Sequence, residues 1–260
     1  MDLDLSGKKV LITGGSKGIG LEIARQFASE GCSLGLVSRS NQDLLEAKNY
    51  LESQYGVKVE NLELDLSKKG ASLFLAATFP IVDVLVNNAG SIPAGTIEEI
   101  DDEKWREAWD LKVFGYINNT REFLKIMKAR GHGVIINIIG IGGERLDAGY
   151  IAGAVGNAGL IALTKALGST SIDSGVRILG INPGPVSTER LEFLARRKAA
   201  IQFGDENRWQ EFQKDMPLSR AAKTSEIAPT VVFLASHLCS YTSGTVLNID
   251  GGSTSRNTKR

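Results

Sequence analysis

The chain has 260 residues, of which 42% are hydrophobic, and its 30 basic side chains balance its 30 acidic ones. This length fits one α/β domain with a substantial core, and the balanced charge argues against nucleic acid or an anionic membrane as a partner. Cys32 and Cys239 lie too far apart in sequence for a metal site, and we expect both to be reduced and buried. Because the N-terminus lacks a signal-peptide pattern and no stretch approaches the ~20 apolar residues of a membrane span, a cytoplasmic protein without membrane contact is predicted.

The segment from Leu11 to Gly31 contains an apolar strand, a glycine-rich turn and an amphipathic helix, in that order. Gly14, Gly18 and Gly20 allow the backbone to turn sharply and to approach a phosphate, while the amides at the start of the helix face the anion. A glycine pattern is a weak signal by itself. Its strand–turn–helix context nevertheless predicts a dinucleotide site.

The second strand, Ser33 to Ser40, ends near the place where a dinucleotide fold meets the adenosine ribose. A carboxylate there would accept from the 2′-hydroxyl and repel a 2′-phosphate. This sequence has Ser38 and Arg39 instead, and Lys17 lies in the glycine-rich turn. Two cations without a carboxylate favour NADP(H) over NAD, because a guanidinium binds a phosphate in bidentate fashion. The alternative is that both cations are solvated surface charges.

The rest of the chain alternates between strand and helix patterns. Apolar runs predict strands at 57–67, 81–90, 133–139, 176–188 and 241–254, and helical patterns cover 43–55, 101–130, 150–168 and 217–236. Within 101–130, a stripe predicted to be buried comprises Trp109, Val113, Tyr116, Thr120, Phe123 and Met127. The alternation predicts an α/β fold. The charged segment 189–216 is helical in pattern but the least determined.

Motifs occur in a fixed order along the chain: T-G-x-x-x-G-x-G at 13–20, N-N-A-G at 87–90, P-G at 183–184 and D-G-G at 250–252. With these motifs the chain resembles the short-chain dehydrogenase/reductase family from about Leu5 to Thr254. The resemblance implies a single-domain Rossmann-type doubly wound parallel sheet flanked by helices, with a lid-like substrate loop at about 189–216. It also implies a homo-oligomer, a dimer or tetramer, formed through the helices at 101–130 and 150–168.

The resemblance further implies a bound nicotinamide dinucleotide, with Asp65 beside the adenine and Thr188 at the nicotinamide amide. The full set of implied cofactor contacts is Gly14, Ser16, Lys17, Gly18, Ile19, Gly20, Ser38, Arg39, Asp65, Leu66, Asn88, Ala89, Gly90, Pro183, Gly184, Val186 and Thr188. No metal ligands are among them.

The usual catalytic set of the resembled family is missing at the matching positions. That set has a serine that binds the substrate oxygen, a tyrosine that transfers the proton, a lysine that lowers the tyrosine pKa and holds the ribose, and an asparagine. An unperturbed tyrosine has a pKa of ~10, so it needs a nearby cation to act at neutral pH. Here the four positions hold Gly140, Gly153, Asn157 and Lys112, in that order. The lysine and the asparagine have therefore exchanged places.

We take Lys112, Tyr150 and Asn157 as the candidate catalytic residues. Lys112 would replace the missing lysine at the ribose or the substrate, and the alternative is a lysine whose amine extends to solvent. Tyr150 would be a displaced acid one helical turn before Gly153, and the alternative is an ordinary aromatic at a helix start. Gly140 and Gly153 are expected to open the pocket.

Two glycines of the predicted helix at 150–168 and three charged residues of the preceding loop each have a structural and a functional interpretation. Gly156 and Gly159 favour close packing against another helix, because glycine otherwise weakens a helix by ~1 kcal/mol relative to alanine. The loop charges Glu144, Arg145 and Asp147 are candidates for acid or anion-binding groups, with solvated loop charges as the alternative.

Together these features predict an NADP(H)-dependent oxidoreductase that transfers hydride between the cofactor and a small-molecule carbonyl or alcohol, with a rearranged active site. The loss of the usual acid removes a contribution of ~10²–10⁴-fold, which still allows catalysis if water or another residue donates the proton. Two alternatives stay open, since fold does not fix function. One is an NADP(H)-binding protein without redox turnover, as a sensor or hetero-oligomer partner. The other is a non-redox lyase or isomerase.

Overall fold

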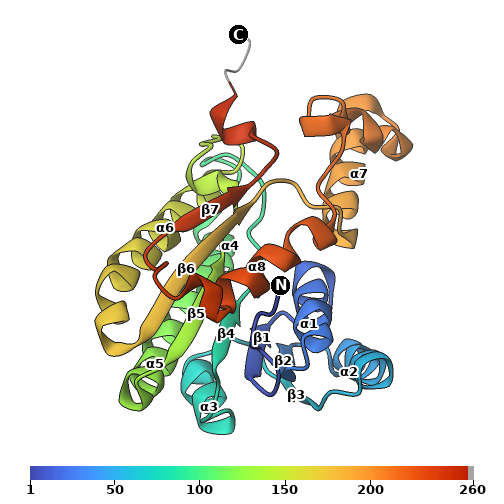
Figure 1. The fold of residues 1–260 in the computed structure, drawn as a ribbon. Helices are drawn as coiled ribbons and strands as arrows, with labels where there is room; N and C mark the ends of the chain where they lie inside the picture. The colour runs from blue at the N-terminus through green and yellow to red at the C-terminus, as the bar shows by residue number, and fades with distance from the viewer. Residues whose placement is uncertain (257–260) are drawn as a thin grey trace.

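Parallel strands form one sheet in the order β3-β2-β1-β4-β5-β6-β7 (Figure 1). The computed structural model describes residues 1–256. The strands are β1 (Lys9–Thr13), β2 (Ser33–Ser38), β3 (Val59–Glu63), β4 (Val84–Asn87), β5 (Gly133–Ile138), β6 (Val176–Pro183) and β7 (Val246–Ile249). Every neighbouring pair is parallel, and the chain reverses its direction of winding between β3 and β4. The doubly wound parallel sheet predicted from the sequence is confirmed.

Helices cover both faces of this sheet. The α-helices are α1 (Gly18–Ser29), α2 (Asn41–Tyr55), α3 (Ala71–Thr78), α4 (Asp102–Trp109), α5 (Gly115–Arg130), α6 (Ile151–Ser171), α7 (Glu189–Phe203) and α8 (Ala228–Ala235). Short 3₁₀ turns join several of them, the longest at Glu206–Gln213. A π-helical turn, Asp110–Phe114, connects α4 to α5.

Successive residues of β1 reach opposite sides of the sheet and so divide the core in two. Val10 and Ile12 pack in one cluster with the apolar faces of α1, α2 and α8. Leu11 packs in the other with α3 and α5. Because both faces are covered, the central strands are apolar throughout and show no alternation in sequence.

The helix expected over 101–130 is built from α4, the π-helical turn and α5. The predicted stripe is buried from Val113 to Met127, whereas Trp109 at its start is only partly buried. A π turn adds a residue to the helical circuit and is common at functional sites. Its central residue here is Lys112.

Helix α6 combines length with an apolar sequence. Within residues 1–256, the stretch Ile151–Ser174 passes the length and composition test for a membrane span, and half of its most apolar window is buried inside the fold. The expectation that no stretch approaches such a length is therefore wrong for this segment. Its apolar residues are those of a core helix, since Leu160 is fully buried. Cys32 and Cys239 are free and buried, as expected.

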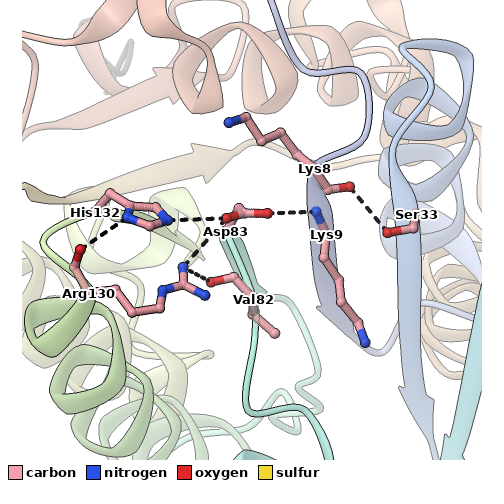
Figure 2. A network of polar contacts seen from close by, with 7 residues as sticks. All are labelled: Lys8, Lys9, Ser33, Val82, Asp83, Arg130 and His132. Atoms are coloured by element: carbon pink, nitrogen blue, oxygen red, sulfur yellow. Dashed lines mark hydrogen bonds and ion pairs between the residues drawn. The ribbon is translucent and has the colours of Figure 1, made fainter.

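A polar network ties together the amino ends of β1, β4 and β5, at the opposite edge of the sheet from the glycine-rich turn (Figure 2). The Asp83 carboxylate accepts from the Lys9 backbone amide at 2.8 Å and from the Arg130 guanidinium at 3.5 Å. His132 Nε2 lies 3.6 Å from the same carboxylate, and Arg130 also donates to the Val82 carbonyl at 2.7 Å. We therefore assign a structural role to these contacts at the amino ends of the strands.

The segment 189–216 consists of α7 and the 3₁₀ turn after it, which pack on each other beyond the carboxyl ends of the strands (Figure 1). The rings of Phe203 and Phe212 stack with their centroids 5.4 Å apart. Trp209 lies under the guanidinium of Arg196, 5.6 Å from ring centroid to cation. Phe203 faces the cleft described below and Trp209 does not.

Candidate active site

A large open cleft lies over the carboxyl ends of the strands, bordered by the glycine-rich turn and by α7. Its volume is about 1820 Å³, above the roughly 300–1,000 Å³ of a pocket for one small molecule. The cleft can therefore hold a dinucleotide and a substrate together. The expected site residues that line it are Gly14, Lys17, Gly18, Ile19, Asn88, Ala89, Gly90, Lys112, Gly140, Tyr150, Asn157, Pro183, Gly184, Val186 and Thr188.

The other expected residues do not line this cleft. Ser16 lines a small depression between α1 and α2, while Gly20 and Leu66 are buried. Outside the cleft wall also lie Ser38, Arg39, Asp65 and Gly153. The structure thus brings together the glycine-rich turn, the ends of β4 and β6 and the catalytic candidates, and sets the adenosine candidates apart.

The glycine-rich turn has no room for side chains. Gly14 and Gly18 adopt φ of +65° and +55°, which favour glycine, and a Cβ at Gly20 would meet the Gly14 carbonyl oxygen at 2.1 Å. Asn88 holds the turn by donating its side-chain amide to the carbonyls of Thr13 and Gly14 at 3.0 and 3.1 Å. Helix α1 starts at Gly18 without a side-chain cap and without an acidic residue in its first turn. These free amides fit an anion.

The corner beside α2 contains a carboxylate, Asp43, that the sequence analysis did not connect with the cofactor site. Lys17 Nζ lies 3.1 Å from Asp43 Oδ2, and this hydrogen bond raises the pKa of Lys17. The end of β2 lacks a carboxylate, as the sequence shows, but Lys17 has a carboxylate partner from α2. Arg39 is exposed, and its charge helps to lower the pKa of Asp65, whose carboxylate accepts from the Ser67 amide and hydroxyl.

The far wall of the cleft is formed by the chain that leaves β6. Thr188 caps α7, since its hydroxyl accepts from the Leu191 amide at 3.2 Å, and its methyl group faces Gly18 across the cleft. A Cβ at Gly184 would lie 3.1 Å from the Cα of Asp250. Close packing of this kind keeps the loop after β6 against the D-G-G turn.

Lys112 points into the cleft from the π-helical turn. Its aliphatic stem runs against Gly90, where a Cβ would meet the Lys112 Cδ at 2.8 Å. Its ammonium donates to the Ile139 carbonyl at 2.5 Å, at the end of β5. Burial, together with the nearby charge of Arg190, lowers the pKa of Lys112 to about 8. The Lys112 ammonium thus binds the backbone at the cleft wall.

The ring of Tyr150 fills the space beside Gly153. A Cβ at Gly153 would lie 2.0 Å from Tyr150 Cε1, and one at Gly142 would lie 3.1 Å from the same ring. Burial raises the pKa of Tyr150, and the positive charge of Arg190 partly offsets that rise. Although Tyr150 precedes Gly153 by three residues, its ring thus lies where a side chain at 153 would lie.

Asn157 occupies the wall between α6 and β5. Its side-chain amide donates to the Gly140 carbonyl at 3.4 Å, and its Oδ1 is buried without a partner among the described residues. Such an acceptor is costly unless a ligand or water donates to it. Gly140 adopts φ of +118°, which disfavours any side chain there.

Beneath the cleft floor, buried side chains form a polar ladder across β4, β5 and the adjoining helices. Asn87 Nδ2 donates to Asn137 Oδ1 at 3.0 Å and Asn119 Nδ2 donates to Asn87 Oδ1 at 3.1 Å. Asn137 in turn donates to Thr164 Oγ1 of α6 at 2.9 Å. Asn87 thus links β4 to β5 through its side chain.

Sequence reasoning missed Arg190, the second residue of α7. Its guanidinium reaches across the cleft to the carbonyls of Gly90, at 3.5 Å, and Ile92, at 3.2 Å. Burial lowers the pKa of Arg190, and Tyr150 raises it in part. A signal was present in the sequence, because a cation in the first turn of a helix opposes the helix dipole.

The loop charges have distinct places. Glu144 lines the cleft and accepts from the side-chain amides of Asn248 at 2.7 Å and Asn182 at 3.4 Å. Asp147 Oδ1 accepts from the Gly149 amide at 2.8 Å. Elsewhere in α6, Gly156 packs against Val113 and Trp109 of the neighbouring helical segment, as expected for close helix packing.

Comparisons with known proteins give one consistent result. A family model described as enoyl-(acyl carrier protein) reductase matches residues 14–254. An uncharacterized oxidoreductase of Thermotoga maritima is 31% identical over 97% of this chain and 99% of its own, and the 3-oxoacyl-(acyl-carrier-protein) reductase FabG of Chlamydia muridarum is 31% identical over 95% and 98%. A crystal structure of L-sorbose reductase from Gluconobacter frateurii, complexed with NADPH and L-sorbose, is similar with a TM-score of 0.90 and 33% identity, covering 99% of this chain and all of that one.

Proposed function

The chain belongs to the short-chain dehydrogenase/reductase family of oxidoreductases, and we propose that it transfers hydride between NADP(H) and a small-molecule carbonyl or alcohol through a rearranged active site. The observation that carries this proposal is the Tyr150 ring, which lies against the backbone of Gly153. The proton-transferring phenol is thereby supplied from a neighbouring position of the chain.

The residues present fit a nicotinamide dinucleotide. The uncapped start of α1 and the bare glycine-rich turn would hold the pyrophosphate through Gly14, Gly18, Ile19 and Gly20. When bound, the cofactor supplies or accepts the hydride, and the protein orients it. The nicotinamide half would be held by a set in the same cleft that comprises Asn88, Ala89, Gly90, Pro183, Gly184, Val186 and Thr188.

The preference for NADP(H) over NAD is part of the same proposal. Lys17 and Arg39 would supply positive charge to the 2′-phosphate, and Ser16, Ser38, Asp65 and Leu66 would surround the adenosine. The sorbose reductase of similar structure was solved with NADPH, which supports the choice. Asp43 opposes it, because a carboxylate beside Lys17 repels a 2′-phosphate.

Within the catalytic set, Tyr150 would donate the proton to the substrate oxygen during reduction. Its pKa is raised by burial, so the phenol keeps its proton at neutral pH and serves as an acid better than as a base. Asn157 would offer its unpartnered Oδ1 to a hydroxyl donor of the substrate or of the ribose. Lys112 would fix the end of β5 through the Ile139 carbonyl and contribute positive charge to the cleft.

The surroundings of the site enter the proposal as well. Segment 189–216 would act as a substrate lid over the cleft, because α7 contributes Arg190 and Leu194 to its wall. The exposed sides of α5 and α6 would form a homo-oligomer contact, since Val155 is 47% exposed and the space at Gly159 is open. A cytoplasmic location would follow from the reduced state of the two cysteines.

The test measures NADPH consumption with a mixed panel of ketones and aldehydes, together with NADPH and NADH binding by calorimetry. We expect turnover that prefers NADPH and that falls at least about 100-fold in Tyr150→Phe, because general acids contribute about 10²–10⁴-fold. The exposed Tyr241→Phe serves as the matched control. NADPH binding without turnover would contradict the proposal and favour a binding protein. Product formation without cofactor consumption would favour a lyase or isomerase.

A further inference from the structure

Lys112 and Arg190 bring two positive charges to the substrate end of the cleft. Both line its wall; Lys112 is half-buried there, and Arg190 is exposed to the open cleft. In residues 1–256, neither takes part in an ion pair with a carboxylate. Each donates only to backbone carbonyls: Lys112 to Ile139, and Arg190 to Gly90 and Ile92.

The two cations converge on one short stretch of backbone. The stem of Lys112 packs against the Cα of Gly90, and the guanidinium of Arg190 binds the carbonyl of the same residue. Besides burial, the charge of Arg190 lowers the pKa of Lys112, and it offsets part of the burial-driven rise in the pKa of Tyr150. The pair therefore lies next to the phenol that we assign to proton transfer.

Glu189 and Asp215 also line the cleft, and neither forms an ion pair with Lys112 or Arg190. Other carboxylates of the region are engaged elsewhere. Glu144 is held by the amides of Asn248 and Asn182, and Asp147 by its own loop. Asp43 pairs with Lys17 on the other side of the glycine-rich turn. No carboxylate of the described chain neutralises Lys112 and Arg190.

Charges placed in this way are expensive. Removing a cation from water costs free energy that a backbone carbonyl only partly returns, and like charges in one pocket repel each other. This cost falls mainly on the half-buried Lys112, since a lysine in a protein interior is normally paired. An unpaired pair of cations in a ligand cleft is the arrangement expected where the missing anion belongs to the ligand.

The anionic group that the two cations bind could be part of the cofactor or part of the substrate. The phosphates of a dinucleotide would bind at the start of α1, where uncapped backbone amides and Lys17 lie. Lys112, by contrast, reaches the end of β5 at Ile139, close to Gly140 and Asn157 on the substrate side. This placement favours the substrate.

We infer that Lys112 and Arg190 bind an anionic oxygen group, a carboxylate or a phosphate, carried by the carbonyl substrate. The inference rests on the proposed function and specifies its substrate class. The anion would lie against the two cations, and the carbonyl would lie toward Tyr150. Arg190 binds such a group through two donors of a planar fork, whereas Lys112 provides a point charge.

The experiment compares matched substrates that differ in charge. The carboxylate arm pairs pyruvate with methyl pyruvate and acetoacetate with methyl acetoacetate. The phosphate arm pairs dihydroxyacetone phosphate with dihydroxyacetone. We expect the anionic member of at least one pair to have a kcat/KM at least about tenfold higher, the usual effect of a charge-assisted hydrogen bond. The arm that responds identifies the anion.

Variants test which residues are responsible. Lys112→Met and Arg190→Met should each reduce the anionic-to-neutral ratio about tenfold or more while the Kd for NADPH stays within about twofold. Arg190→Lys, which keeps the charge, should retain part of the preference. The exposed cations Lys128→Met on α5 and Arg197→Met on α7 are the controls, and neither lines the cleft.

Two results would overturn the inference while leaving the reductase intact. One is equal or better turnover of every neutral member. The other is an Arg190→Met variant that loses NADPH affinity and slows both members of a pair equally, because the cation would then serve the cofactor.

Absence of turnover with every compound would count against the proposed function, and binding then decides the inference separately. NADP-saturated protein is titrated calorimetrically with acetoacetate, methyl acetoacetate, dihydroxyacetone phosphate and dihydroxyacetone. Binding of an anionic member alone, lost in Lys112→Met and Arg190→Met, supports an anion site in this cleft. Equal binding of the anionic and neutral members, or no binding of either, refutes it.

Discussion

The ring of Tyr150 occupies the space that a side chain at Gly153 would need: a Cβ added at 153 would lie 2.0 Å from Cε1 of that ring. Glycine at 153 is therefore a steric condition for the position of Tyr150. The two residues work as a unit, in which one supplies the phenol and the other supplies the room for it.

Gly153→Ala should lower kcat by about tenfold or more, because the new methyl group pushes the phenol away from its position and misplaced catalytic groups lose about this much or more. The measurement is kcat with the best substrate of the panel. Gly159→Ala is the matched control on the same helix, since the space there is open; it should leave kcat unchanged and stabilise the helix by up to about 1 kcal/mol. Equal activity of both variants would contradict the paired role.

Asp43→Asn should strengthen NADPH binding about twofold to fivefold, since it frees Lys17 from a weak, exposed ion pair and removes a repelling carboxylate. NADH binding should change less, because NADH has no 2′-phosphate. Lys17→Met should have the opposite effect on NADPH. Calorimetric Kd values for both cofactors check these changes, and an equal shift for NADH and NADPH would refute the assignment of this corner.

Lys112→Met should raise the free energy of unfolding by about 1–3 kcal/mol at pH 7, because the folded protein holds this amine at a lowered pKa. The folded pKa is about 8 against an ordinary value of 10.5. Between these values the unfolded chain binds more protons, so the stability of the parent protein rises with pH. The advantage of the variant should shrink toward zero near pH 10. Urea titrations at several pH values measure it, and a pH-independent gain would contradict the assignment.

Asp83→Ala should cost about 1–2 kcal/mol of stability without changing the kinetic constants, because it removes the acceptor shared by the Lys9 amide, Arg130 and His132 at the far edge of the sheet (Figure 2). Asp102→Ala removes a fully exposed ion pair with Arg106 and should leave the stability nearly unchanged. Thermal and urea unfolding compare the two variants. A loss of activity without a loss of stability would show that this edge communicates with the cleft.

The elements that sequence predicted best are those whose cause is local. The glycines at 14, 18 and 20 are required by backbone sterics within a few residues, so strand, turn and helix followed from the pattern. The apolar strands followed likewise from burial on both faces. The observed ends of helices differ by a few residues from the predicted ones where capping sets the end. The helix predicted from residue 43, for example, begins at Asn41, after its cap Ser40.

The parts that sequence did not predict depend on contacts between distant segments. Asp43 meets Lys17 only because α2 packs beside α1, and Arg190 meets Gly90 only because α7 returns over the cleft. The π-helical turn at Asp110–Phe114 leaves no mark in composition. The position of the Tyr150 ring depends on a rotamer at the start of α6, which spacing along the chain does not encode.

The buried ladder of Asn87, Asn137 and Thr164 has a consequence for how the strands find their alignment. Strands that are apolar on both faces lose little when they slide past each other, because no solvent face is exchanged for a core face. A slip of one residue between β4 and β5 would separate the two asparagine amides, whose bond is 3.0 Å long, and would leave the buried Asn137 Oδ1 without its donor. The register of β4 against β5 is thus specified by hydrogen bonding rather than by hydrophobic pattern. The positions of the cleft residues that follow these strands depend on that register.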